Sequence, residues 1–85
     1  MKNKVLVKIK VPEIDKIYDV YLPISKKIGN ILILINKAIS EMTNNEFKIS
    51  NENVLYNSTT GERYDLNTLL LDTDIRNGTE LTLLS

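Results

Sequence analysis

The side chains that most often perform acid–base or nucleophilic catalysis are missing from this sequence, which contains neither histidine nor cysteine. A serine or threonine nucleophile would therefore need another activating base. Lys26 and Lys27 follow Ser25, but a lysine becomes a base only where burial removes its proton, and these lysines are expected on the surface. We therefore predict that the chain is not an enzyme and has no catalytic residues.

Two further patterns resemble binding motifs only in part. Asp72-Thr73-Asp74 begins like a calcium loop, but Arg76 occupies the next ligand position and Gly78 comes too late for the turn that such a loop requires. The three glycines are isolated from one another, so they form no phosphate-binding loop. The sequence thus predicts no metal site and no cofactor.

Charge is balanced overall but divided unevenly along the chain. The formal net charge is zero, which argues against nucleic-acid binding, because phosphate contacts need clustered lysine and arginine. Residues 1–40 hold eight lysines and three acids, a net charge of +5, whereas residues 41–85 hold three basic residues and eight acids, a net charge of −5. This asymmetry predicts either an ordinary solvated surface or weak, salt-sensitive self-association.

No segment of the sequence is expected to enter a membrane. The longest apolar run, Ile31 to Ile35, is far shorter than the roughly 20 residues that span a bilayer, and Lys8 and Lys10 interrupt the apolar stretch near the N-terminus. The lack of cysteine removes disulfides as a source of stability and suits a cytoplasmic protein. We expect one domain covering residues 1–85.

Two short segments at the N-terminus alternate between apolar and polar residues. Val5, Val7, Ile9 and Val11 alternate with lysines and Leu6, which is typical of a strand with one buried face. In the second segment, one face carries Tyr18, Val20 and Leu22, and the other carries Ile17, Asp19 and Tyr21. The polar turn between the two segments predicts an antiparallel hairpin.

The period then changes to that of a helix. An apolar stripe with three- and four-residue spacing follows, with Ser25 as the expected N-cap; it consists of Ile28, Ile31, Leu32, Ile35, Ile39 and Met42. The asparagine-rich segment after it predicts a loop, attached to the core by Phe47 or Ile49.

The last third of the chain predicts further strands around a short helix. Residues 54–56 and 62–64 flank a turn-forming segment that ends at Gly61, so they are expected to form a second hairpin. Leu66, Leu69, Leu70 and Ile75 are spaced as in a short helical turn that packs on a core. Asn77-Gly78 predicts a tight turn before a last strand with Leu81 and Leu83 facing inward.

This order of elements resembles the ubiquitin-like β-grasp along nearly the whole chain. The most similar stretch is L-L-D-T-D-I-R-N-G-T-E-L-T-L-L, residues 70–84. The strand Tyr18-Asp19-Val20-Tyr21-Leu22-Pro23 resembles the YukD/EsaB family of small ubiquitin-like proteins associated with type VII secretion in Gram-positive bacteria. The resemblance implies an α+β fold in which a mixed four- to five-stranded sheet packs on one helix.

The resemblance also bears on chemistry. Ubiquitin and the related sulfur carriers act through a tail that ends in two glycines, whereas this sequence ends Leu84-Ser85. Conjugation and sulfur carriage are therefore not expected unless the native chain is longer.

Strict alternation identifies a candidate partner-binding surface. If Val54, Tyr56, Leu81 and Leu83 face the helix, the opposite face of the sheet carries the apolar side chains of Leu6, Tyr21, Leu55 and Leu84. Leu55 and Leu84 occupy positions that match the outer faces of the third and fifth strands of ubiquitin, where its recognition patch lies. The alternative is a set of isolated exposed apolar residues, as every protein carries. Ile33, which lies off the helix stripe, is a second candidate.

We therefore predict a non-catalytic interaction or regulatory protein, with secretion-machinery components among its expected protein partners. The alternatives are a free-standing ubiquitin-like adaptor unrelated to secretion and a truncated sulfur carrier or modifier.

Overall fold

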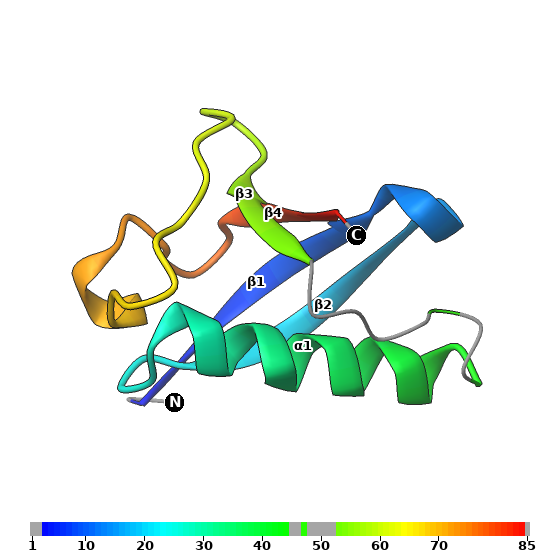
Figure 1. Cartoon of the computed structure of the whole chain (residues 1–85), viewed down its shortest axis with the longest axis horizontal. Helices are drawn as coiled ribbons and strands as arrows, with labels where there is room; N and C mark the ends of the chain where they lie inside the picture. The colour runs from blue at the N-terminus through cyan, green and yellow to red at the C-terminus, as the bar shows by residue number, and fades with distance from the viewer. Residues whose placement is uncertain (1–2, 45–46, 48–52, 85) are drawn as a thin grey trace.

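One mixed sheet and one long helix make up most of the fold, as a computed structural model describing residues 3–44, 47 and 53–84 shows (Figure 1). The helix lies across one face of the sheet. The elements in chain order are β1 (Lys4–Val11), the 3-10 helix η1 (Pro12–Ile14), β2 (Lys16–Pro23), α1 (Ile28–Met42), β3 (Val54–Asn57), the 3-10 helix η2 (Leu70–Asp72) and β4 (Glu80–Leu84).

The first and last strands lie side by side at the centre of the sheet. The four strands have the order β2-β1-β4-β3. β1 pairs antiparallel with β2 and parallel with β4, and β3 pairs antiparallel with β4. β2 and β3 are therefore the two edge strands, and the predicted mixed sheet is confirmed.

The N-terminal hairpin follows the predicted alternation. Val7, Ile9 and Val11 of β1 are buried, whereas the lysines between them are exposed. In β2, Leu22 is buried and Ile17, Asp19 and Tyr21 are exposed. The hairpin is antiparallel from Lys4 opposite Pro23 to Val11 opposite Lys16, so one of its faces packs toward α1 and the other faces solvent.

α1 contributes an apolar stripe to the core. Ile28, Ile31, Ile35 and Ile39 are completely buried, as the helical spacing predicted, whereas Met42 at the end of the stripe is half exposed. Phe47 is buried after the helix, and Ile49 lies outside the described residues. Together with the inward residues of the sheet, this stripe forms one continuous hydrophobic core.

The start of α1 is not capped by Ser25, and this prediction was wrong. The N-cap is Lys27, and no side chain accepts a hydrogen bond from the first turn. Instead, the N–H of Ile28 donates to the carbonyl of Thr68 at 2.9 Å, and the N–H of Gly29 donates to the carbonyl of Leu66 at 2.9 Å. A loop distant in sequence thus satisfies helix donors that a capping side chain satisfies in other helices.

The predicted second hairpin is reduced to a single β-bridge. Residues 62–64 form no strand, and they pair with β3 at an isolated bridge between Tyr56 and Arg63, which a backbone hydrogen bond flanks on each side. Side chains also attach this loop: the hydroxyl of Tyr64 donates to Asp74 Oδ1 at 2.7 Å and accepts from Asn57 Nδ2 at 3.1 Å. The loop is therefore fixed to the segment before β4 by polar contacts.

The segment before β4 forms the predicted short helical turn. Leu70 and Ile75 are buried, but Leu66 and Leu69 remain exposed. Gly78 has a φ of 88°, the left-handed conformation that the Asn77-Gly78 turn requires.

Among the described residues, no helix has the length and apolarity needed to cross a membrane.

Candidate interaction surface

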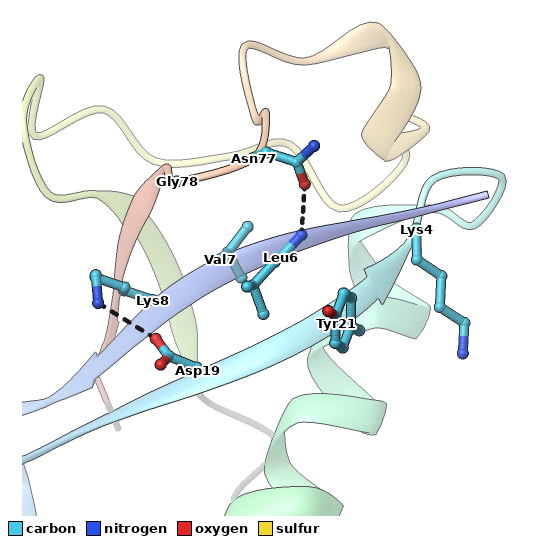
Figure 2. A pocket seen from close by; sticks show the side chains of 8 residues that line it. All are labelled: Lys4, Leu6, Val7, Lys8, Asp19, Tyr21, Asn77 and Gly78. Carbon is cyan, nitrogen blue, oxygen red and sulfur yellow. Dashed lines mark hydrogen bonds and ion pairs between the residues drawn. The ribbon is translucent and has the colours of Figure 1, made fainter. Parts of the chain in front are cut away.

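The face of the sheet opposite α1 carries a shallow hollow between β1 and β2. Leu6 and Tyr21 are direct cross-strand partners there, with exposed fractions of 36% and 52%. Figure 2 shows their side chains next to each other on this face. Asn77 and Gly78 close the hollow on the side of β4, and its volume is about 370 Å³.

Hydrogen bonds between β1 and the turn before β4 fix the floor of this hollow. The Leu6 N–H donates to Asn77 Oδ1 at 2.8 Å, and the Gly78 N–H donates to the Leu6 carbonyl at 2.8 Å. The Lys8 N–H donates to the Thr79 carbonyl at 3.0 Å. The turn before β4 thus extends the sheet next to Leu6, so the hollow lies on rigid backbone rather than on a loose loop.

Charged side chains stand at both ends of the hollow. At one end, Lys8 Nζ lies 3.4 Å from Asp19 Oδ1, and both side chains are more than half exposed. At the other end, Lys4 extends past Tyr21 (Figure 2). Lys4 belongs to no ion pair within residues 3–44, 47 and 53–84. The hollow therefore combines an apolar centre with an unneutralised positive charge.

Leu55 does not belong to this face, so its prediction as a surface residue was wrong. Its side chain is only 2% exposed, because it lies opposite buried Leu83 in the pairing of β3 with β4. Directly paired residues of neighbouring strands share a face. The residues of β3 on the outer face are Val54 and Tyr56, which the sequence placed inside.

Buried asparagines share the inward face of β3 with Leu55. Asn53 and Asn57 point inward on either side of Leu55 and are almost completely buried. Asn53 Nδ2 donates to Asn36 Oδ1, and Asn57 Oδ1 accepts from the N–H groups of Thr59 and Thr60 at 2.9 and 3.1 Å. These bonds reduce the cost of burying the amides, although the buried Asn53 Oδ1 has no partner among the described residues.

Leu84 lies on the predicted face but at its far end. It is 39% exposed and pairs with Val54. The register of Lys8 opposite Glu80 places Leu84 level with residue 12, just past the end of β1 and six residues from Leu6, or roughly 20 Å. Lys8, Lys10, Glu80 and Thr82 occupy the space between them. The outer face thus has two apolar clusters, Leu6 with Tyr21 and Leu84 with Val54 and Tyr56, instead of one patch.

Ile33 is exposed on the flank of α1, as its position off the apolar stripe predicted. It lies one helical turn after Gly29, whose N–H contacts the Leu66 carbonyl, and Leu66 is also exposed. This second apolar surface lies on the helix and the loop at Leu66, away from the outer face of the sheet. Among the described residues, no group of acidic, histidine or cysteine side chains has an arrangement that could hold a metal ion.

No family model and no curated protein matches this sequence. Solved structures do match it. The ubiquitin-like domain of the type VII secretion system protein EccD1 of Mycobacterium tuberculosis superposes with a TM-score of 0.73 and 17% identity, over 96% of this chain and 98% of that domain. The fold is the ubiquitin-like β-grasp. The fold that the sequence resemblance implied is thereby confirmed.

Two further matches show the range in which this fold occurs. A chain of an ESX-5 inner membrane complex matches with a TM-score of 0.70 and 16% identity over 96% of this chain, which corresponds to only 21% of that longer chain. A chain in a toluene 4-monooxygenase complex matches with a TM-score of 0.71, although the identity is 6%, over 94% of this chain and 95% of that chain. Because the fold serves such different assemblies, function must be argued from the surface.

Proposed function

We propose that this chain is a non-catalytic ubiquitin-like protein that binds a protein partner through the hollow at Leu6 and Tyr21. The observation that carries the proposal is the combination of two exposed apolar side chains on rigid, paired strands with a lysine at the rim. A solvent-exposed tyrosine is a favourable anchor, because it brings a large apolar area and a polar tip with little conformational freedom to lose.

The rim indicates the chemistry of the partner. Because Lys8 is already paired with Asp19, the charge that remains free beside the hollow is that of Lys4. The best-fitting partner segment therefore places an apolar side chain over Leu6 and Tyr21 and an acidic residue near Lys4. Neutralisation of an exposed lysine adds mainly to the association rate and depends on salt.

We further propose that the partner is a component of a type VII secretion system. Support comes from the YukD/EsaB-like sequence between Tyr18 and Pro23 and from the shared fold with the ubiquitin-like domain of EccD1. In this role the chain would act in the cytoplasm as an accessory protein. The sequence supports the lack of catalysis, because it contains neither of the two residue types that most often act as base or nucleophile.

The test compares two serine substitutions at leucines of similar exposure. Leu6→Ser should weaken binding to a partner captured from the native host by at least tenfold, which corresponds to about 1.4 kcal/mol. Leu84→Ser, at the far end of the same face, should leave binding unchanged. Both variants should keep the melting temperature close to that of the wild type, because neither side chain belongs to the core.

The opposite pattern would identify the cluster at Leu84 as the binding site and contradict the proposal. The link to secretion is tested separately, by deleting the gene in its native host and measuring the secreted substrates of the type VII system. Normal secretion together with a captured partner outside the secretion machinery would favour the adaptor alternative.

A further inference from the structure

The two edges of the sheet differ in what covers them. At β3, the loop after the strand occupies the edge: the Asn57 N–H donates to the Glu62 carbonyl at 2.9 Å, and the Tyr64 N–H donates to the Leu55 carbonyl at 3.1 Å. At β2, no described residue outside the β1–β2 ladder has a backbone hydrogen bond with residues 17–23. An uncovered edge strand is a template for pairing with another chain.

The register shows which backbone groups of β2 are free. Because the N–H of Lys8 and the carbonyl of Leu6 bond toward β4, the even-numbered residues of β1 face β4 and the odd-numbered residues face β2. Val7 lies opposite Val20, so the even-numbered residues of β2 face β1. The N–H and C=O groups of Ile17, Asp19 and Tyr21 therefore point away from the sheet.

The side chains along this edge are unusually apolar for an edge strand. On the outer face, Ile17 is 56% exposed and Tyr21 is 52% exposed. On the inner face, Tyr18 and Val20 are only partly buried. Natural sheet edges are commonly protected by charge, proline or a covering loop, and in the segment from Ile17 to Tyr21 the one charged residue is Asp19.

The neighbouring flank of α1 is apolar as well. Asn36 and Gly29 mark the side of α1 that contacts the segment before β3 and the loop at Leu66. Helical geometry places Leu34 and Ala38 on the opposite flank, which is the flank toward β2. Leu34 is 46% exposed there. A strand added to β2 would therefore bring further apolar surface next to Leu34.

We propose that β2 pairs antiparallel with β2 of a second copy of this chain, centred on Asp19. The sequence of the strand indicates a second copy, because it is self-complementary about that residue. In this register, Ile17 lies opposite the partner's Tyr21 on the outer face, and Tyr18 lies opposite the partner's Val20 on the inner face. Pairs of aromatic and β-branched residues are among the favourable cross-strand pairs.

The two-fold arrangement satisfies the free backbone groups and leaves one unfavourable contact. Every outward N–H and C=O of Ile17, Asp19 and Tyr21 gains a partner, and the two sheets become one continuous sheet with both helices on the same face. The two Asp19 carboxylates, however, lie directly opposite each other, which is destabilising. Lys8, at 3.4 Å from Asp19, offsets part of this repulsion in each copy.

A charge-swap experiment tests the register. Wild-type protein should show a concentration-dependent monomer–dimer equilibrium in sedimentation. Ile17→Glu and Tyr21→Lys should each weaken dimerisation by at least tenfold, because each places a charge opposite an apolar partner twice per dimer. An equimolar mixture of the two variants should recover dimerisation, since the heterodimer contains one glutamate–lysine pair and one intact isoleucine–tyrosine pair.

A mixture of Ile17→Glu with Tyr21→Glu is the matched control, because its heterodimer places two glutamates opposite each other at the same cross-strand position, and it should not recover dimerisation. Both edge positions are more than half exposed, so unchanged circular dichroism of each variant alone should show that the fold is retained. A wild-type protein that remains monomeric at high concentration would overturn the proposal, and so would equal recovery in the control mixture.

Asp19 provides an independent test. Asp19→Asn should strengthen dimerisation several-fold, because it removes the facing carboxylates, and added salt should strengthen the wild-type dimer by screening them. Attraction between the basic and acidic halves of the chain predicts the opposite salt dependence. Dimers that dissociate in salt and are unchanged by Asp19→Asn would therefore contradict strand pairing. Binding at Leu6 is tested by other variants, so the two proposals can fail separately.

Discussion

Leu55 is buried between two inward-facing asparagines, Asn53 and Asn57, each of which makes a hydrogen bond inside the protein. We therefore expect Leu55→Ala to lower the free energy of unfolding by about 2–5 kcal/mol, as removal of a large core side chain does. Leu84→Ala on the outer face should lower it by less than about 0.5 kcal/mol. Denaturant titrations of both variants measure the difference, and equal effects would mean that Leu55 is not in the core.

The sequence could not reveal this reversal. Alternation shows that the two faces of a strand differ, and on β3 the more apolar alternation is that of Val54 and Tyr56. The face that is buried instead carries Asn53, whose amide donates to Asn36, 17 residues earlier in the chain. On β1 and β2 the alternation coincides with polar residues that have no buried partners, so those faces were predicted correctly. The exposure of Leu6 and Tyr21 was therefore predicted correctly, whereas Leu55 was placed on the wrong face. The distance between Leu6 and Leu84 follows from the parallel register of β1 and β4, which the sequence does not reveal.

Tyr64 connects the loop after β3 to Asp74. Burial, together with the hydrogen bond to Asp74, raises the pKa of the Tyr64 hydroxyl well above its usual value of 10. The folded state thus holds this proton more tightly than the unfolded state. The resulting stability is fully present below about pH 10 and is lost as the pH rises above that value.

Tyr64→Phe should therefore cost about 1 kcal/mol at neutral pH through the lost hydrogen bonds. It should also make the decline in stability at alkaline pH smaller than in the wild type. The measurement is the free energy of unfolding at neutral and strongly alkaline pH. Tyr21→Phe, which removes a hydroxyl with no hydrogen-bond partner among the described residues, is the control and should retain the wild-type decline.

At the level of elements, α1 is held by its apolar stripe and by a distant loop rather than by local capping. Ile35→Ala should reduce stability by about 2–5 kcal/mol. Lys37→Ala, on the exposed side of the helix, should change it by less than about 0.5 kcal/mol. Thermal or denaturant unfolding tests both, and similar losses at the two positions would contradict the orientation of the helix.

Ser25→Ala should be nearly neutral, because the first donors of α1 bond to the carbonyls of Leu66 and Thr68. Removal of a serine that truly caps a helix typically costs about 1 kcal/mol. A loss of that size in the same unfolding measurement would show that Ser25 caps the helix after all. The sequence pattern could identify the helix from its period, but it could not reveal a cap supplied by backbone nearly 40 residues away.

For the whole molecule, the position of β4 determines whether the core can form. β4 lies between β1 and β3, and its Leu81 and Leu83 are buried. Removal of Glu80–Leu84 should therefore abolish cooperative unfolding and the dispersion of amide resonances, since β3 would lose the strand with which it pairs. Thr82→Ala, on the outer side of the same strand, should remain folded. A truncated chain that still unfolds cooperatively would contradict this dependence on β4.

The same arrangement has a consequence for synthesis. β1 is made first, yet the strand beside it at the centre of the sheet, β4, is made about seventy residues later. Until residues 80–84 leave the ribosome exit tunnel, one edge of β1 has no neighbouring strand and β3 has no strand to pair with. Closing so long a loop is slow compared with forming the N-terminal hairpin or α1. This domain must therefore expose apolar surface until β4 has left the tunnel, and only then can it reach its stable form.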